Sequence, residues 1–248
     1  MQAGRRAGSP AAGGVRAVIL AGGKGTRLRP YTTILPKPLL PFGDRPVLEM
    51  IIRQLARHGY RHIDLCVGHL GSLIRSYFAE VPMPDGVELH YHWESQPLGT
   101  AGALRGIDDL DEPALVMNGD VVTTLDFGHL MRAHTDSGAA VTIAAHEKAV
   151  PIDLGVIEET DFAVTGYIEK PTMRFRVSMG VYVFDPRAVD HIPEGYFDFP
   201  DVVRALIAAR ESVRIYPFTG KWFDIGTPAE YERAAAEYGD EPGAFLDV

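Results

Sequence analysis

The chain has 248 residues, of which 46% are hydrophobic and 23% are charged, a balance typical of one large globular domain. Its net charge of −9 argues against a nucleic-acid partner, because binding to a phosphate backbone needs clustered Lys and Arg. No apolar run approaches the roughly 20 residues of a membrane span, and one cysteine, Cys66, excludes an internal disulfide. We therefore expect a cytoplasmic protein that binds neither nucleic acid nor membrane, with Cys66 as a buried core thiol.

Ordered structure is expected to begin at residue 15. Residues 1–14 are rich in Gly, Ala and Arg and are expected to form a disordered extension. A single domain is expected over residues 15–239, and residues 240–248 are expected to form a short tail.

Hydrophobic periodicity predicts alternating strands and helices through the first half of the chain. Strands are predicted at 15–20, 62–67, 87–92, 114–117 and 139–145, and helices at 46–58, 70–79 and 126–137, with a short helix before residue 114. Asp44 is expected to cap the first of these helices, and His90 and His92 are expected to be strand residues rather than ligands. This alternation predicts an α/β fold with a Rossmann-like, mostly parallel mixed sheet that is flanked by helices.

The second half of the chain shows a different pattern. Short strands separated by turns from residue 154 to 184 predict a small β-rich lobe over one edge of the sheet. Helices at 187–192, 199–210 and 228–238 and a strand at 213–216 complete the domain. In an open parallel sheet a ligand binds at the carboxyl ends of the strands, and the motifs described next follow such ends.

The first predicted strand runs into a glycine-rich turn, Gly22-Gly23-Lys24-Gly25-Thr26-Arg27. Glycines let backbone N–H groups approach a phosphate closely, and Arg27 adds positive charge. The turn matches neither a dinucleotide fingerprint nor a P-loop, so by itself it is a weak signal. Lys37 follows between two prolines that restrict its backbone. The alternative is that the turn and the Pro-rich loop are only connectors.

Taken together with later motifs, this region resembles the sugar-1-phosphate nucleotidylyltransferase family. The matching motifs, which span nearly all of residues 15–238, are Gly22 to Pro30, Pro36-Lys37-Pro38, Pro97 to Ala103, Asn118-Gly119-Asp120, Glu169-Lys170-Pro171 and Trp222 to Pro228. The resemblance implies the nucleotide-diphospho-sugar transferase fold, with the β-rich lobe binding the sugar. It also implies that the substrates are a nucleoside triphosphate and a sugar 1-phosphate, and a homo-oligomer is compatible with it.

The resemblance also implies roles for individual residues. Asp120 and Asp224 bind Mg²⁺, which prefers one or two carboxylates together with substrate phosphates. Arg27 and Lys37 are the catalytic cations, with Arg27 on the departing β- and γ-phosphates and Lys37 on the α-phosphate. The nucleotide-binding residues are Ala21, Gly22, Gly23, Gly25, Thr26, Glu94, Gly99 and Thr100. Without the resemblance, Asp120 could form a turn and Asp224 a helix cap.

The sugar phosphate is expected to contact Gly155, Glu169 and Lys170, again by resemblance. A carboxylate accepts hydrogen bonds from sugar hydroxyl groups, and a lysine reaches a phosphate. Many relatives carry Asn before an Ala-Gly or Ser-Gly pair, where this chain has Val177-Ser178-Met179, so sugar contacts there are not carried over.

Glu94 favours GTP as the nucleotide. Relatives that use uracil or thymine tend to have Gln at this offset from Gly99, whereas a carboxylate only accepts hydrogen bonds and suits the adjacent N1–H and N2–H₂ groups of guanine. If the loop turned Glu94 away, Gln96 would read the base, and dTTP or UTP remains the alternative substrate. From other classes, the alternatives are an inactive nucleotide-sugar-binding regulatory module and a nucleotide hydrolase.

Overall fold

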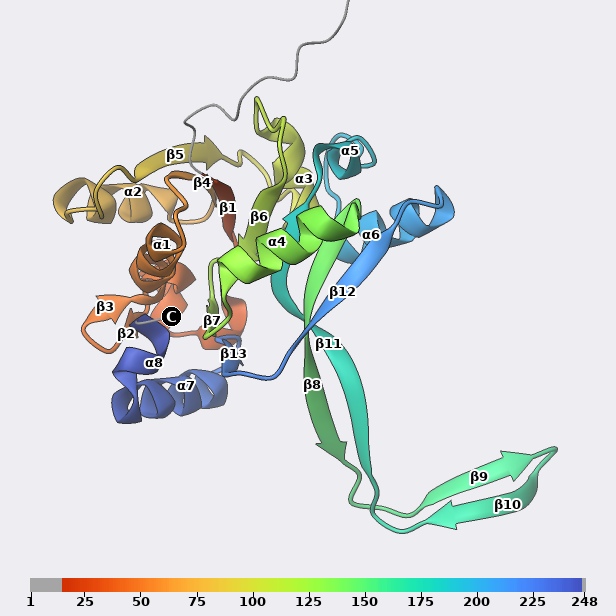
Figure 1. Ribbon diagram of the computed structural model, residues 1–248. Helices are drawn as coiled ribbons and strands as arrows, with labels where there is room; N and C mark the ends of the chain where they lie inside the picture. Colours follow the sequence, from red (N-terminus) through yellow and green to blue (C-terminus); the bar gives the residue numbers. More distant parts are fainter. Residues whose placement is uncertain (1–14, 247–248) are drawn as a thin grey trace, which may run out of the picture.

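The computed structural model describes residues 15–246, so the extension expected over residues 1–14 lies outside the described part. Its centre is a seven-stranded sheet with the strand order β12-β8-β11-β6-β1-β4-β5 (Figure 1). These strands are β1 (Arg16–Ala21), β4 (His62–Val67), β5 (Glu88–Trp93), β6 (Ala114–Asn118), β8 (Val141–Pro151), β11 (Thr172–Phe184) and β12 (Val213–Phe218).

The sheet is mixed and mostly parallel. Strand β1 pairs in parallel with β4 and β6, β4 pairs in parallel with β5, and β12 with β8, whereas β11 runs antiparallel to both β6 and β8. The parallel pairs place the carboxyl ends of β1, β4, β5 and β6 at one edge, which is where the predicted motifs follow. The predicted fold class is confirmed.

Helices cover both faces of this sheet. They are α1 (Val47–Arg57), α2 (Gly71–Glu80), α3 (Gly99–Gly102), α4 (Phe127–Ser137), α5 (Pro186–Val189), α6 (Phe199–Ala208), α7 (Pro228–Asp240) and α8 (Pro242–Leu246), with 3₁₀ turns η1 (Thr26–Leu28), η2 (Tyr31–Thr33), η3 (Lys37–Leu39) and η4 (Ala103–Gly106). Residues of α1, α2 and α4 pack on one face of the sheet and residues of α3, η4 and α6 on the other, because successive strand side chains point to opposite faces. Cys66 is fully buried in the second cluster, as expected.

Three two-stranded sheets complete the fold. Strand β13 (Trp222–Asp224) pairs with β7 (Val121–Thr123), β2 (Pro41–Phe42) with β3 (Arg45–Pro46), and β9 (Val156–Thr160) with β10 (Ala163–Ile168). Strands β8 and β11 are longer than the sequence pattern predicts, and they leave the body as a ribbon that continues into the β9–β10 hairpin (Figure 1). The β-rich segment is therefore a projecting arm, here defined as residues 152–171, rather than a lobe over an edge of the sheet. The Ile152 amide donates to the Pro171 carbonyl at its base (2.9 Å).

One further detail differs from the expectations. Pro46, not Asp44, is the residue that precedes the first turn of α1, and no side chain caps this helix. Within the expected short tail, residues 242–246 form α8, whose Phe245 is fully buried against the ring of Tyr238. Among residues 15–246, no helix combines the length and the apolar character needed to span a bilayer.

Candidate active site

The glycine-rich turn follows β1 directly and lies close to the segments that carry Thr32 and Lys37. Gly25 has a left-handed conformation (φ 58°, ψ 33°), and a Cβ atom there would lie 2.9 Å from the Thr32 side chain and 3.1 Å from Cβ of Lys37. The Thr32 hydroxyl donates to the Gly25 carbonyl (2.7 Å), which holds the turn. Glycine is needed here because a side chain would be strained and would push the Lys37 segment away.

Lys37 begins η3, between the buried prolines 36 and 38. Its side chain is only 12% exposed, and its ammonium group donates to the carboxylate of Asp120. The pairing joins the Pro-rich loop to the segment after β6. The prolines therefore hold Lys37 inward, as their restriction of the backbone predicts.

Asp120 and Asp224 lie side by side because β13 pairs with β7. Asp224 is the pairing partner of Val121, and the Ile225 amide donates to the Asp120 carbonyl (3.1 Å). Burial, reinforced by the Asp120 carboxylate and opposed by Lys37 and Arg27, raises the pKa of Asp224. Oδ1 of Asp120 is buried and has no hydrogen-bond partner within the described residues. Two adjacent carboxylates with one orphaned oxygen fit a divalent cation, which would satisfy that oxygen and offset the repulsion.

The guanidinium group of Arg27 reaches the same place. A Cβ atom on Gly226 would lie 3.4 Å from Nη2 of Arg27 and 3.5 Å from Oδ1 of Asp224, so both groups border Gly226. Arg27, Lys37, Asp120 and Asp224 thus converge from four separate segments. Two cations and two carboxylates at the edge of a sheet can hold a polyphosphate and a metal ion together.

A cavity of about 350 Å³ opens next to this cluster. It is lined by Leu20, Gly22, Gly23, Glu94, Pro97, Gly99, Thr100, Asn118, Asp120, Tyr196 and Asp198. Five of the eight residues expected to bind the nucleotide are in this lining. Of the other three, Ala21 is buried at the end of β1, and Gly25 and Thr26 lie in the turn next to Arg27.

Glu94 is half-buried in the wall of the cavity and lies against Gly22. A Cβ atom on Gly22 would be 2.7 Å from Oε1 of Glu94, and the Leu98 amide donates to Oε2 (3.3 Å). Burial raises the pKa of Glu94, although the Leu98 hydrogen bond opposes this change. Gln96, the alternative base reader, is exposed and does not line the cavity.

Three polar lining residues, Asn118, Tyr196 and Asp198, were not among the predicted site residues, although Asn118 belongs to a matching motif. Asp198 accepts from the Thr100 amide (2.9 Å) and from the Tyr196 hydroxyl (2.7 Å), and these bonds lower the pKa of Asp198. The Thr100 hydroxyl in turn accepts a hydrogen bond from the Phe199 amide (2.8 Å). The sequence offers only two local signals for these residues: Asp198 comes directly before the helix α6, and Asn118 lies two residues before Asp120. Neither position indicates that the side chain lines a cavity.

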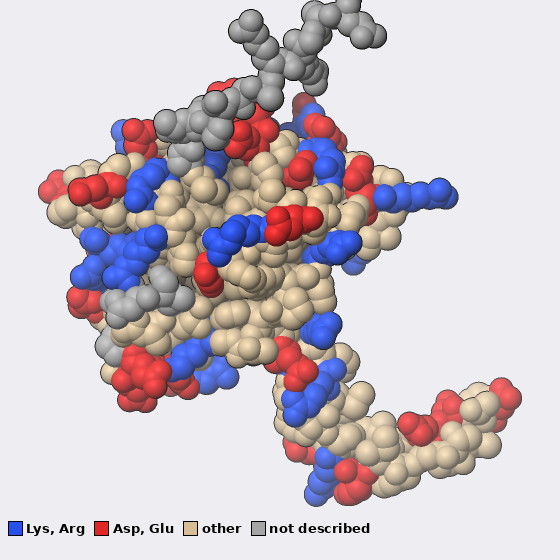
Figure 2. All heavy atoms as spheres, in the orientation of Figure 1, with Lys and Arg blue, Asp and Glu red and all other residues tan. Residues whose placement is uncertain are grey.

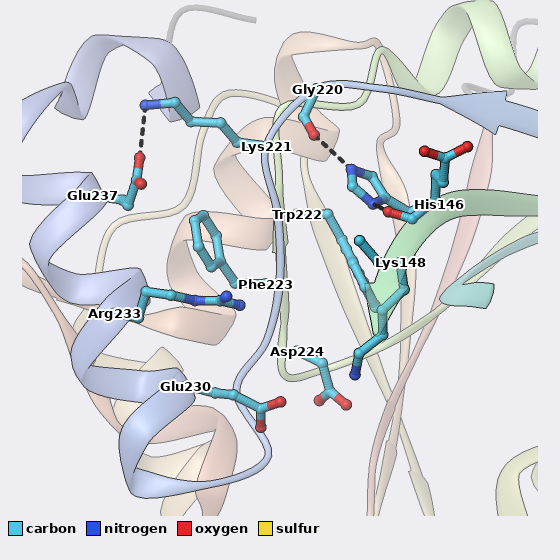
Figure 3. A pocket seen from close by; sticks show the side chains of 12 residues that line it. His146, Lys148, Gly220, Lys221, Trp222, Phe223, Asp224, Glu230, Arg233 and Glu237 are labelled. Carbon is cyan, nitrogen blue, oxygen red and sulfur yellow. Dashed lines mark hydrogen bonds and ion pairs between the residues drawn. The ribbon is translucent and has the colours of Figure 1, made fainter. Parts of the chain in front are cut away.

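A second cavity, of about 510 Å³, borders Asp224. Its walls are the base of the β8 ribbon, β13 and α7, and it includes His146, Lys148, Trp222, Glu230 and Arg233 (Figure 3). Asp224 lines this cavity and Asp120 lines the first one. The acidic pair therefore borders two cavities, one lined by the glycine-rich turn and one lined by the base of the ribbon.

The three residues expected to contact the sugar phosphate lie on the arm. Glu169 and Lys170 are exposed, Lys170 has a φ of 44°, and a Cβ atom on Gly155 would overlap the Tyr167 ring. None of the three lines either cavity. The structure therefore brings together the predicted metal and phosphate residues but not these three.

The comparisons with known proteins show the family of this chain. A family model described as "Nucleotidyl transferase" matches residues 16–241. The mannose-1-phosphate guanyltransferase of Yarrowia lipolytica is 32% identical over 225 residues, which are 88% of this chain and 62% of that protein. The UTP–glucose-1-phosphate uridylyltransferase of a Synechocystis strain is 32% identical over 244 residues, 89% of this chain and 62% of that protein. The chain therefore spans less than two thirds of the length of these relatives.

Solved structures share the fold. HddC from Yersinia pseudotuberculosis has a TM-score of 0.69 and 25% identity, with 90% of this chain and 99% of that chain covered. A UDP-glucose pyrophosphorylase in complex with UDP-glucose has a TM-score of 0.72 at 20% identity, covering 92% of this chain and 99% of that chain. The predicted family is confirmed, and this chain belongs to the nucleotidyl transferase family, together with sugar-1-phosphate nucleotidyltransferases.

Proposed function

We propose that this chain transfers a nucleoside monophosphate from a nucleoside triphosphate to a sugar 1-phosphate and releases pyrophosphate. The observation that carries the proposal is the convergence of Arg27, Lys37, Asp120 and Asp224 beside a cavity lined by glycines. A sugar phosphate oxygen is already anionic at neutral pH, so the reaction needs no general base. It needs positive charge that brings two anions together.

The phosphate oxygen of the acceptor attacks the α-phosphorus in line, and the bond from that phosphorus to the β-phosphate oxygen breaks. We propose that Lys37 contacts the α-phosphate and that Arg27 holds the departing β- and γ-phosphates. The Gly22 to Thr26 turn supplies backbone N–H groups to the same anion. The close packing of Gly25 against Lys37 supports this arrangement.

Asp120 and Asp224 would hold Mg²⁺, with substrate phosphates as the remaining ligands. The orphaned Oδ1 of Asp120 and the raised pKa of Asp224 support a cation between them. Within the described residues there is no cluster of three or more His, Cys, Asp or Glu side chains suited to a metal, which favours a site that is completed by the substrate. When bound, Mg²⁺ would neutralise the charge that develops on the leaving pyrophosphate.

GTP is the nucleotide that we favour. Glu94 lines the cavity and Gln96 does not, so the carboxylate is the group placed to read a base. Guanine offers two adjacent donors to a carboxylate, whereas uracil or thymine would leave one oxygen unpaired. Mannose-1-phosphate guanyltransferases are among the relatives, and HddC is also known in a complex with GMP-PN. UTP or dTTP is the alternative, because a uridylyltransferase is equally similar.

We propose that the acceptor enters the second cavity, on the ribbon side of Asp224. The two cavities flank the acidic pair, as the two substrates of an in-line transfer must flank the reacting phosphorus. The ribbon leads from this cavity to the arm, which carries Gly155, Glu169 and Lys170 (Figure 1). These three residues remain the proposed contacts of the sugar phosphate, and they would reach it only if the ribbon bends toward the body.

A pyrophosphate-release assay with five nucleoside triphosphates and several sugar 1-phosphates tests the function. We expect release only when both substrates and Mg²⁺ are present, with the highest kcat/KM for GTP. Triphosphate hydrolysis without an acceptor would indicate a hydrolase instead. Binding of a nucleotide sugar without any turnover would indicate an inactive regulatory module.

A further inference from the structure

The arm exposes an unusual amount of apolar surface. Its exposed apolar side chains, which are 45% to 95% accessible, are Leu154, Ile157, Phe162, Val164, Tyr167 and Ile168. They are distributed over both faces of a two-stranded hairpin that projects away from the body (Figure 1). An isolated hairpin of this kind is marginally stable in water, and large exposed apolar patches mark interaction sites.

The turn at the tip of the arm has an unusual backbone conformation. Asp161 and Phe162 form the turn between β9 and β10, and both have positive φ values, 51° and 65°. Such a turn is normally made by Asn-Gly or Asp-Gly, because a bulky side chain is strained in the left-handed region. Phe162 is nonetheless 95% exposed, so within one chain its ring makes no contact that offsets the strain. An aromatic ring held outward in a strained turn is suited to contact another surface.

The arm is also acidic. Glu158, Glu159 and Asp161 lie at its outer end, and residues 151–169 contain no Lys or Arg. Figure 2 shows acidic side chains along the outer part of the arm. In a chain with a net charge of −9, most other surfaces would repel this tip.

One surface of opposite charge lies over α1. A groove of about 480 Å³, here named the arginine groove, is lined by Arg45, Arg53, Ala56, Arg57, Arg61, Pro84 and Asp85. Figure 2 shows the blue side chains gathered on this side of the body. Arg53 is held by Glu49 (2.7 Å), and Arg61 donates to the carbonyls of Ala56 and Tyr60. These bonds orient the guanidinium groups, and Arg61 has no carboxylate partner in the described part of the chain.

We propose that the arm tip of one copy of this chain docks in the arginine groove of a second copy, so that two chains exchange arms in a two-fold dimer. Glu158, Glu159 and Asp161 would pair with the arginines, and Phe162 would insert between them. Guanidinium–carboxylate pairs can be bidentate, and arginine stacks favourably on an aromatic ring. Because each chain offers both an arm and a groove, a reciprocal exchange closes the assembly at two copies. Only the tip of the arm takes part in this docking. Gly155, Glu169 and Lys170 lie at the base of the hairpin and are not part of the proposed interface.

Charge reversal with complementation tests the proposal. The arm variant carries Glu158→Lys, Glu159→Lys and Asp161→Lys, and the groove variant carries Arg57→Glu and Arg61→Glu. Light scattering after gel filtration should show a dimer for the unchanged chain and a monomer for each variant alone. An equimolar mixture of the two variants should form a dimer again, because each reversed arm then meets a reversed groove and each original arm meets an original groove.

A matched control changes charge elsewhere by the same amount. Asp111→Lys, Glu112→Lys and Asp136→Lys alter three exposed carboxylates that form no ion pair among the described residues, and this control should remain a dimer. Phe162→Gly should weaken dimerisation about tenfold or more, although it relaxes the turn. If the groove variant does not fold, the arm variant still tests the proposal. The three residues changed in the arm variant are exposed on the hairpin, so we expect this variant to fold.

Three results would overturn the proposal. One is a monomer for the unchanged chain at all concentrations tested, and another is a dimer that the arm variant leaves intact. The third is a groove variant that, although folded, keeps the dimer mass of the unchanged chain. None of these results depends on nucleotidyl transfer, so they do not bear on the proposed function.

Discussion

The Lys37 ammonium group donates to the Asp120 carboxylate, joining two segments that are 83 residues apart in the chain. The other oxygen of this carboxylate is buried and unpartnered within the described residues. In the proposed reaction the Asp120 carboxylate would help to hold the metal ion, which would leave the Lys37 ammonium group available to the α-phosphate. The ion pair would thus hold the proposed catalytic cation in place before the substrate arrives.

Lys37→Gln should lower kcat about 10²- to 10³-fold, the usual cost of removing one group that stabilises developing negative charge. The substitution removes the cation but keeps a side chain of similar length between the two prolines. Steady-state pyrophosphate release measures the effect. Arg204→Gln, which removes a positive charge from an exposed pair with Asp201, should leave kcat unchanged. Equal activity of the Lys37→Gln variant would show that Lys37 is structural.

Asp224→Asn should weaken Mg²⁺ binding and yet stabilise the protein in the absence of metal. Asp224 is partly buried beside another carboxylate, and both effects raise its pKa, so the neutral amide removes a repulsion that the metal ion otherwise offsets. Thermal unfolding with and without Mg²⁺ and nucleotide measures both effects, the expected rise in Tm without metal and the expected loss of stabilisation by Mg²⁺. The control Asp136→Asn, at an exposed position, should change neither quantity. A lower Tm without metal would contradict the prediction.

Glu94→Gln should shift the ratio of kcat/KM for GTP over UTP by about tenfold toward UTP, because the amide offers guanine one acceptor and one mismatched donor. A parallel series over pH adds a second readout. Burial raises the pKa of Glu94, so its ionised form, which accepts from both guanine donors, is lost as the pH falls through this raised value. The preference for GTP should decline there in the unchanged enzyme and should not depend on pH in the variant. An unaltered preference would mean that another group reads the base.

Gly22→Ala should raise the Kd for nucleotide without unfolding the protein. The new methyl group would lie 2.7 Å from Oε1 of Glu94, and the flexible carboxylate can move away, but only out of the position from which it would read the base. Calorimetric titration with GTP measures the loss. Gly106→Ala is the matched control, since nothing lies within 4 Å of a Cβ atom there. If both variants bind GTP equally, Glu94 does not contribute to binding from its position beside Gly22.

The sequence alone was sufficient to predict the alternation of strands and helices and the motifs that follow the strand ends. Both depend on neighbouring residues, because periodicity of 2 or 3.6 and the backbone preferences of glycine and proline act over short spans. For this reason Gly22 to Arg27 and Lys37 could be recognised as phosphate-binding candidates.

Only the tertiary structure decided what these segments face. That Asp224 adjoins Asp120 depends on the pairing of β13 with β7, which are about a hundred positions apart, and no local pattern specifies such a pairing. The same holds for Tyr196 and Asp198 in the nucleotide cavity and for the choice of Glu94 over Gln96 in its wall. The position of the arm is also a feature that only the tertiary structure decided. The sequence predicted short strands separated by turns in this segment. Whether these strands cover the sheet or project from it as a hairpin depends on which surface can bury their apolar side chains, and that is a property of the assembled fold.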